Sequence, residues 1–168
     1  MKKVLVFILT LFVTLPMFSQ KLSKEEKAAL AKEQYESAIQ AINDKAFVLI
    51  PSSYIDENGI DQALTDNSIF ISYEKTKMYM QGLRVCDNNY TNVAEVTEYL
   101  PKIDKKGNLK LRIVVMGRMI KGTYTISMRR NGNIADVIFA PANGTTRKFQ
   151  GPIVPLNGAS YIKRANPM

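Results

Sequence analysis

From residue 47 onward, apolar and polar residues alternate in short segments that are separated by Gly, Asn and Asp. This period of two is that of a β-strand, in which successive side chains point to opposite faces of a sheet. The segments with this pattern are 47–50, 68–73, 77–81, 93–100, 109–116, 120–129, 134–140 and 146–154. The gaps leave no room for the crossover helices of a parallel sheet, so the pattern predicts an antiparallel β-meander.

The segment TYTISMRRNGNIADVIFAP, residues 123–141, predicts the register of one hairpin. A two-residue type I′ turn at Asn131-Gly132, with positive φ at both positions, places Tyr124 opposite Phe139. It also forms the apolar pairs Met128 with Ala135 and Ile126 with Val137. A slip of one residue would send Tyr124 and Phe139 to opposite faces, so the turn and the burial pattern agree on this register.

Short loops extend the same register to the neighbouring strands. A five-residue loop DKKGN places Tyr99 opposite Ile113, and a three-residue loop ANG places Val137 opposite Phe149. Each pair keeps apolar side chains on one face of the sheet. The predicted fold class is α+β and mostly β, with an N-terminal amphipathic helix packed on an antiparallel β-meander that forms a curved sheet, a sandwich or a small barrel.

The segment before the strands, at about residues 24–43, has the period of an amphipathic helix. Ser23 and Glu26 form a capping box at its start, because each side chain can bind the backbone N–H of the other residue. The apolar stripe consists of Ala28, Ala31, Tyr35, Ala38, Ile39 and Ile42. Half of this stripe is alanine, so we expect the helix to pack on the sheet through its C-terminal half; the binding of a partner is the alternative.

The first 19 residues have the order of an export signal, in which Lys2 and Lys3 precede an apolar run and polar residues follow at once. The run is short for a membrane span, which needs ~20 apolar residues, so we expect cleavage near Gln20; an uncleaved anchor is the alternative. The predicted organisation is a signal peptide at 1–19 and a single domain at 20–168, in which the meander covers about 47–156 and a C-terminal tail follows. The expected location is periplasmic or secreted, with no membrane span after signal removal.

Basic residues form a candidate anion-binding face. Loss of the signal removes two lysines and no acid, so the formal net charge falls from +8 to +6. The predicted outer face of the meander gathers Lys110, Arg112, Lys121, Arg129, Arg147 and Lys148. Export leaves lipid phosphates, lipopolysaccharide cores and acidic glycans as available polyanions, whereas inward-pointing aromatic residues offer no stacking platform for nucleic acid. A solvated face without a partner is the alternative.

Missing residue types exclude several kinds of chemistry. The chain has no histidine and one cysteine, so a histidine-assisted nucleophile and the usual zinc sites are impossible. It also lacks the glycine motifs that bind phosphates and dinucleotides, and no cofactor is expected. The spacing of the acidic segment YIDENGID fits no calcium loop, so we interpret it as a solvated turn. Cys86 is expected to be buried and inert, and an intermolecular disulfide is the alternative.

The order of these segments resembles a known family. The helix KEQYESAIQAINDKAFVLIP, the hairpin KIDKKGNLKLRIVV, the strand pair TYTISMRRNGNIADVIFAP and the closing RKFQGPIVPL follow one another along the chain. This layout resembles that of an exported Bacteroidetes family that is catalogued as the domain of unknown function DUF4251. The resemblance covers nearly the whole mature chain and implies an envelope protein with an N-terminal helix and an antiparallel sheet. It implies no activity, cofactor or site.

Three classes of function stay open. The first is a non-enzymatic exported module that binds a small apolar ligand inside a curved sheet or an envelope component outside it. The second is a small exported hydrolase with two carboxylates, which in glycosidases lie ~5 to ~9.5 Å apart. The third is an inhibitor or assembly partner that uses exposed loops such as VCDNNYTNV.

Overall fold

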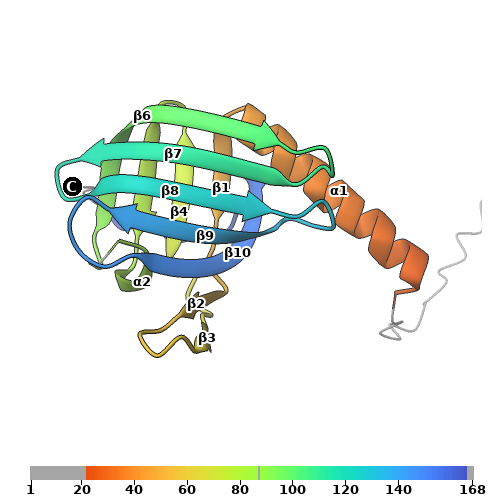
Figure 1. Cartoon of the computed structure of the whole chain (residues 1–168), viewed down its shortest axis with the longest axis horizontal. Helices are drawn as coiled ribbons and strands as arrows, with labels where there is room; N and C mark the ends of the chain where they lie inside the picture. The colour runs from red at the N-terminus through yellow and green to blue at the C-terminus, as the bar shows by residue number, and fades with distance from the viewer. Residues whose placement is uncertain (1–21, 87, 166–168) are drawn as a thin grey trace, which may run out of the picture.

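The structure, a computed structural model, describes residues 22–86 and 88–165. It shows an N-terminal helix beside a strongly curved antiparallel sheet (Figure 1). The predicted signal peptide at 1–19 lies outside the described residues.

Eight strands within the described part of the chain close into an antiparallel barrel (Figure 1). In spatial order they are β1 (Ala46–Leu49), β4 (Phe70–Glu74), β5 (Lys77–Gln81), β6 (Thr91–Ile103), β7 (Leu109–Gly117), β8 (Lys121–Met128), β9 (Ile134–Pro141) and β10 (Arg147–Pro155). These strands correspond to the eight segments that the period-two pattern predicts. Of the three forms that the pattern allows for the sheet, the structure shows the barrel.

Closure of the barrel joins strands from opposite ends of the sequence. β1 pairs with β10, where Phe47 lies opposite Pro155. Gly151 permits the close approach of the two segments, because a Cβ atom at this position would lie 2.2 Å from the carbonyl oxygen of Ile50. Only a residue without a side chain fits there.

Three short elements lie outside the predicted segments. They are β2 (Ser53–Ile55), β3 (Asp61–Ala63) and α2 (Leu83–Cys86). β2 and β3 form a hairpin that β10 holds through β2, and the hairpin projects from the barrel (Figure 1). In its turn the Asp56 carboxylate accepts hydrogen bonds from the backbone N–H groups of Asn58 and Ile60, at 2.9 Å each. The acidic segment therefore forms a turn, as interpreted from the sequence.

The predicted registers are confirmed. Tyr124 lies opposite Phe139 in the β8–β9 pair, and the two apolar pairs beside them are also formed. Tyr99 lies opposite Ile113 in the β6–β7 pair. Val137 likewise lies opposite Phe149. The inner face of the sheet is therefore the apolar face that the alternation predicts.

The predicted type I′ turn at Asn131-Gly132 is wrong. Gly132 has a φ of 147°, but Asn131 is not among the residues with positive φ. Beyond Gly132, the Asn133 side chain donates to the Ile153 carbonyl at 2.9 Å, and the Ile153 N–H donates to the Asn133 carbonyl at 2.9 Å, so Asn133 is bonded to β10. β8 ends at Met128 and β9 begins at Ile134, so residues 129–133 connect the two strands.

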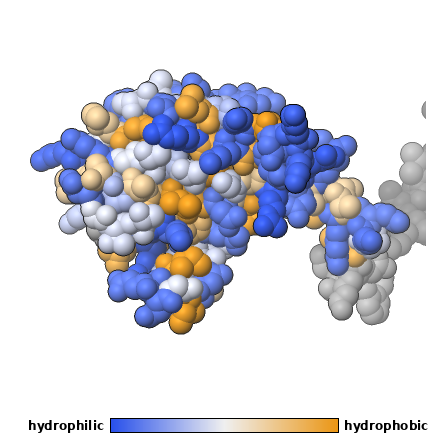
Figure 2. Space-filling view, in the orientation of Figure 1, coloured by the Kyte–Doolittle hydropathy of each residue, from blue (hydrophilic) through white to orange (hydrophobic). Residues whose placement is uncertain are grey.

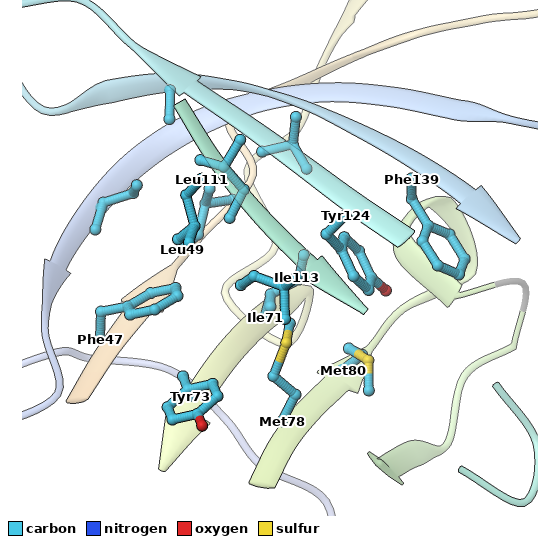
Figure 3. Packing of buried hydrophobic residues seen from close by; sticks show 14 of the residues in the cluster. Phe47, Leu49, Ile71, Tyr73, Met78, Met80, Leu111, Ile113, Tyr124 and Phe139 are labelled. Atoms are coloured by element: carbon cyan, nitrogen blue, oxygen red, sulfur yellow. The ribbon is translucent and has the colours of Figure 1, made fainter. Parts of the chain in front are cut away.

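Side chains fill the interior of the barrel (Figure 3). The largest fully buried ones include Tyr124, Phe47, Phe139, Leu49, Ile71, Met78, Met80, Leu111, Ile113 and Ile126. The Tyr124 and Phe139 rings stack with their centroids 4.2 Å apart. An interior filled in this way is a packed core and not a ligand chamber.

The helix α1 (Lys24–Asn43) begins at the predicted capping box and lies at one end of the barrel. The Tyr35 hydroxyl donates to the Gly107 carbonyl in the β6–β7 loop at 2.6 Å. The Tyr99 hydroxyl donates to the Ile42 carbonyl at the last turn of the helix, also at 2.6 Å. The buried helix residues are Ala38, Ala41 and Ile42, so the C-terminal half carries the packing, as predicted.

The predicted C-terminal tail lies across the outside of β4 and β5. Lys163 Nζ lies 2.8 Å from Glu74 Oε1, and the Tyr161 hydroxyl donates to the same oxygen at 3.1 Å. The Gln81 side chain donates to the Ile162 carbonyl at 2.9 Å. Residues 156–165, here called the C-terminal strap, therefore cover polar groups on the outer face of the barrel.

Candidate functional site

A cavity opens at the end of the barrel away from α1. β6 runs toward the helix, so the β7–β8 and β9–β10 loops and the short α2 lie at the opposite end (Figure 1). The cavity has a volume of about 330 Å³. It is lined by Cys86, Arg118, Met119, Ile120, Lys121, Phe139, Pro141, Ala142, Asn143 and Arg147. We call it the mouth cavity.

Three of the described residues that line the mouth cavity are basic. Arg118, Lys121 and Arg147 are cationic, and none of the described lining residues is acidic. Asp87 follows Cys86 in the sequence and lies outside the described residues. Cations that surround a concave surface raise the local concentration of anions, because low-dielectric walls focus their field.

The outer-face position predicted for Arg147 is wrong. Arg147 lies opposite Phe139 in the β9–β10 pair, and Phe139 is buried. Phe149, two residues further along β10, also points inward, so the period of two turns Arg147 to the inner side. Because Arg147 is the first residue of β10, its half-buried side chain reaches the mouth cavity and not the core.

Tyr124 places a polar atom beneath this cavity. Its ring is buried, and among the described residues its hydroxyl has no hydrogen-bond partner. Burial raises the pKa of Tyr124 well above its ordinary value; Cys86 adds to this shift and the Arg147 charge opposes it. The hydroxyl therefore stays protonated and lies within electrostatic range of two residues that line the mouth cavity.

Cys86 is buried, as predicted. Its Sγ atom donates to the Gly82 carbonyl at 3.4 Å and accepts from the Asn92 side chain at 3.1 Å. Asn92 is itself fully buried and also donates to the Met80 carbonyl at 3.3 Å. These contacts hold α2 against the barrel as one wall of the mouth cavity.

Of the other five predicted basic residues, Lys121 also lines the mouth cavity, and the remaining four lie on the outer surface of the barrel. Lys110, Arg112, Lys121, Arg129 and Lys148 are all exposed. Arg112 forms an ion pair with Glu98. Asp136 lies opposite Ser127, which is itself opposite Lys110. Figure 2 shows hydrophilic and hydrophobic residues intermixed on the face of the barrel that it displays.

A second cavity lies between the β2–β3 hairpin and strands β9 and β10. It has a volume of about 270 Å³, and two carboxylates, those of Asp61 and Asp136, are among the lining groups. Asp136 accepts a hydrogen bond from the Gln150 side chain at 2.9 Å. Lys148, one of the predicted basic residues, also lines this cavity.

The sequence interpretation missed Arg118 and the position of Arg147. Arg147 could have been placed from the predicted pairing of Val137 with Phe149, since counting back two residues along β10 gives an inward-pointing side chain. Arg118 lies between β7 and β8, where strand periodicity gives no direction. Its place in the cavity lining follows only from the closed barrel, in which the β7–β8 and β9–β10 loops meet at one end.

The described residues contain no group of three or more His, Cys, Asp or Glu side chains that could hold a metal ion. In the same part of the chain, neither helix combines the length and the apolar character that a membrane crossing requires.

Comparison with known proteins supports the resemblance in fold. No protein-family model matches the sequence. No curated protein matches it either. The structure is similar to that of a DUF4251 family protein from Bacteroides eggerthii DSM 20697, with a TM-score of 0.68 and 23% sequence identity over 79% of this chain and 94% of the other. The chain therefore resembles the DUF4251 family in structure as well as in the layout of its sequence.

Proposed function

We propose that this chain is an exported, non-enzymatic module of the cell envelope that binds a small ligand at the open end of its barrel. One observation carries the proposal: the end of the barrel away from α1 has the mouth cavity of about 330 Å³, formed where the β7–β8 and β9–β10 loops meet. Small-molecule sites are concave and occur in the mouths of β-barrels, with volumes of about 300–1,000 Å³.

The packed interior directs the ligand to this end. Two fully buried side chains, Met80 and Tyr124, occupy the barrel beneath the mouth cavity. An apolar ligand inside the sheet, which the sequence allowed, would have to displace such side chains at a large cost in packing. The volume of the mouth cavity is at the low end of the range for ligand sites, which favours a small molecule over a polymer.

The chemistry of the lining favours binding over catalysis. No carboxylate or histidine is among the described lining residues, so the usual general bases are missing from this cavity. The Tyr124 hydroxyl has a raised pKa and is an unsuitable base at neutral pH. The described lining groups can bind and orient a ligand, and they lack an evident means to move its protons.

One observation favours the hydrolase alternative. Asp61 and Asp136 line the same cavity, and two carboxylates beside one cavity are the minimum that a glycosidase needs. An assay with nitrophenyl glycosides tests it, and Asp136→Asn should abolish any activity that depends on this pair. A role for the loop at 85–93 in binding a partner protein stays a prediction.

Thermal shift measurements test the proposed function. Protein purified after expression of the full chain is heated in the presence of a panel of sugars, amino acids, alcohols and organic acids. Ala142 lines the mouth cavity, so Ala142→Trp should block it. Ala140→Trp is the matched control, because Ala140 is an exposed residue of the same strand region outside the cavity lining.

We expect at least one class of compound to raise the melting temperature of the parent and of Ala140→Trp but not of Ala142→Trp. A panel that leaves the parent unchanged, or that stabilises both variants equally, would contradict a ligand site at this end of the barrel.

A further inference from the structure

We propose that the outer face of β4, β5 and β6 carries a peptide-binding site, which the C-terminal strap occupies and which accepts an extended segment of the same pattern from a partner protein. The pattern is an aromatic residue two positions before a lysine, as at residues 161–163. We call the site the peptide groove, and its residues are Phe70, Glu74, Tyr79, Gln81 and Thr91. None of them is among the described residues that line the mouth cavity, so the two sites are independent.

The register of three strands places the groove residues on one face. Phe70 pairs with Gln81, and Gln81 pairs with Thr91 in the next strand. Their neighbours Ile71 and Met80 belong to the core, so the period of two turns the groove residues outward. Gln81 and Thr91 are nevertheless only 0% and 1% exposed. The strap is what covers these outward-pointing side chains, because both are hydrogen-bonded to it.

The Gln81 side chain binds the backbone of the strap. Its amide donates to the Ile162 carbonyl at 2.9 Å and accepts from the Arg164 N–H at 2.9 Å. The Thr91 hydroxyl donates to the Arg164 carbonyl at 3.2 Å, and the Ile162 N–H donates to the Asn67 carbonyl at 3.1 Å. Every extended peptide offers the same backbone donors and acceptors, so these four contacts do not depend on the sequence of the bound segment.

Side chains at alternate positions of the strap supply the sequence preference. Tyr161 and Lys163 are half-buried, whereas the isoleucine between them is 57% exposed. The centroid of the Tyr161 ring lies 4.6 Å from that of Phe70. Lys163 Nζ lies 3.3 Å from the centroid of the Tyr79 ring and 2.8 Å from Glu74 Oε1. Backbone hydrogen bonds that give affinity, together with pockets for alternate side chains that give specificity, are typical of sites for extended peptides.

Release of the strap leaves the barrel closed. The β1–β10 pairing that closes the barrel uses residues up to Pro155, and the strap begins only after it. Three of the five groove residues, Glu74, Gln81 and Thr91, are polar, so water can hydrate them when the strap leaves. A partner segment with the same pattern then replaces one set of contacts by a similar set, and the exchange requires no rearrangement of the strands.

The strap competes with a partner segment, because both need the same groove. The apparent affinity for the partner segment is therefore reduced by the fraction of molecules in which the strap has left. Changes that weaken the strap must strengthen binding of a free peptide, whereas changes that weaken the groove must weaken it. These opposite effects distinguish a peptide-binding site from a segment that only stabilises the fold.

Fluorescence anisotropy with the full chain tests the inference. The probe is a labelled peptide ASYIKRA, residues 159–165, and the control peptide ASSISRA lacks the tyrosine and the lysine. The strap variant carries Tyr161→Ser with Lys163→Ser, which removes the ion pair and both ring contacts of the strap. We expect it to bind the probe about tenfold more tightly than the parent does. Ile162→Ser is the matched control on the same strap, because its side chain points to solvent, and it should change the affinity by less than about twofold.

A second pair of substitutions locates the groove. Gln81→Ala, added to the strap variant, removes the amide that binds the peptide backbone and should weaken probe binding by about tenfold or more. Lys77→Ala in the same background is the matched control, because Lys77 is an exposed residue of the same strand that pairs with Glu95 outside the groove. It should change probe binding by less than about twofold. Circular dichroism and melting temperature confirm that all variants remain folded.

Three outcomes would overturn the inference: no binding of the probe to the strap variant, equal binding of the two peptides, or equal effects of Gln81→Ala and Lys77→Ala. Size-exclusion chromatography identifies a different occupant. A dimer of the parent that the strap variant does not form would assign the groove to the strap of a second copy, and it would overturn the partner protein as the source of the segment.

Discussion

Arg147 lies directly opposite Phe139 across strands β9 and β10, so a cation stands on the inner side of the sheet next to a buried aromatic ring. Phe139 in turn stacks on Tyr124, with an angle of 17° between the ring planes. At the open end of the barrel, the packed aromatic pair of Tyr124 and Phe139 therefore lies directly next to the cationic Arg147 at the rim. This transition gives the mouth cavity an apolar floor and a cationic edge.

The Tyr124 hydroxyl gives a prediction about stability. A buried hydroxyl without a partner costs about 1–3 kcal/mol, so Tyr124→Phe should raise the free energy of unfolding by about 1 kcal/mol. Tyr99→Phe is the matched control, because the Tyr99 hydroxyl donates to the Ile42 carbonyl at 2.6 Å and its loss should destabilise by a similar amount. Urea denaturation measures both. Equal destabilisation by the two variants would show that the Tyr124 hydroxyl has a partner in solution.

The C-terminal strap gives a prediction about pH. Burial alone would raise the pKa of Glu74, but the hydrogen bonds that its carboxylate accepts from Lys163 and Ser72 outweigh burial and lower the pKa below the ordinary value of 4.5. A carboxyl group with a lowered folded-state pKa stabilises the protein above pH 4.5, and this contribution is lost as the pH falls through the folded-state pKa.

Melting temperatures measured between neutral and acidic pH test this. Glu74→Gln should melt below the parent at neutral pH, and the difference should shrink as Glu74 becomes protonated in the parent. Glu95→Gln is the control, because it removes the same charge from an exposed ion pair with Lys77 and should have little effect. A difference between Glu74→Gln and the parent that does not change with pH would refute the role of the ionised carboxylate.

Gly132 gives a prediction about backbone conformation. Its φ of 147° is unfavourable for a β-branched residue, and no atom lies within 4 Å of the place where a Cβ would stand. Gly132→Val should therefore destabilise by about 1 kcal/mol through the backbone alone. Asn131→Val is the neighbouring control, because Asn131 does not have positive φ. Equal melting temperatures of Gly132→Val and the parent would contradict the strain.

Much of the barrel follows from the sequence because its strands are neighbours along the chain. Period-two alternation and short loops set the pairing of β6 through β10, and the pair of Tyr124 with Phe139 tests it at one point. Closure could not be predicted in this way, since the pairing of Phe47 with Pro155 joins residues over a hundred positions apart. The β2–β3 hairpin has strands of three residues, which is too short for a periodic signal.

The candidate site was only partly predictable for a related reason. A count of basic residues selected six positions by charge, whereas the mouth cavity is defined by which ends of the strands meet. The sequence analysis named Arg147 but placed it on the outer face of the sheet. It named Lys121 without the residues that lie beside it in the cavity, and it did not name Arg118. Only the closed barrel brings the loops that carry them to one place.

Export gives a prediction that fractionation can test. Lys2 and Lys3, the apolar run and the polar residues after it lead us to expect a mature protein that begins near Gln20 in the periplasmic or secreted fraction. Mass spectrometry of the fractionated protein measures its first residue. A cytoplasmic protein with an intact Met1 would be incompatible with export, whatever the ligand of the barrel.

The outer surface gives the last prediction, which concerns polyanions. Arg112 pairs with Glu98, and Asp136 interrupts the cations nearby, so the exposed charges are dispersed and partly neutralised. We expect the parent to bind heparin weakly and to elute below physiological salt, since charges in water are screened over ~8 Å at ~0.15 M ionic strength. Replacement of Lys110, Arg112, Arg129 and Lys148 together by Gln should abolish even this retention. Retention of the parent above physiological salt that this variant loses would instead make the outer face a polyanion site, separate from the mouth cavity.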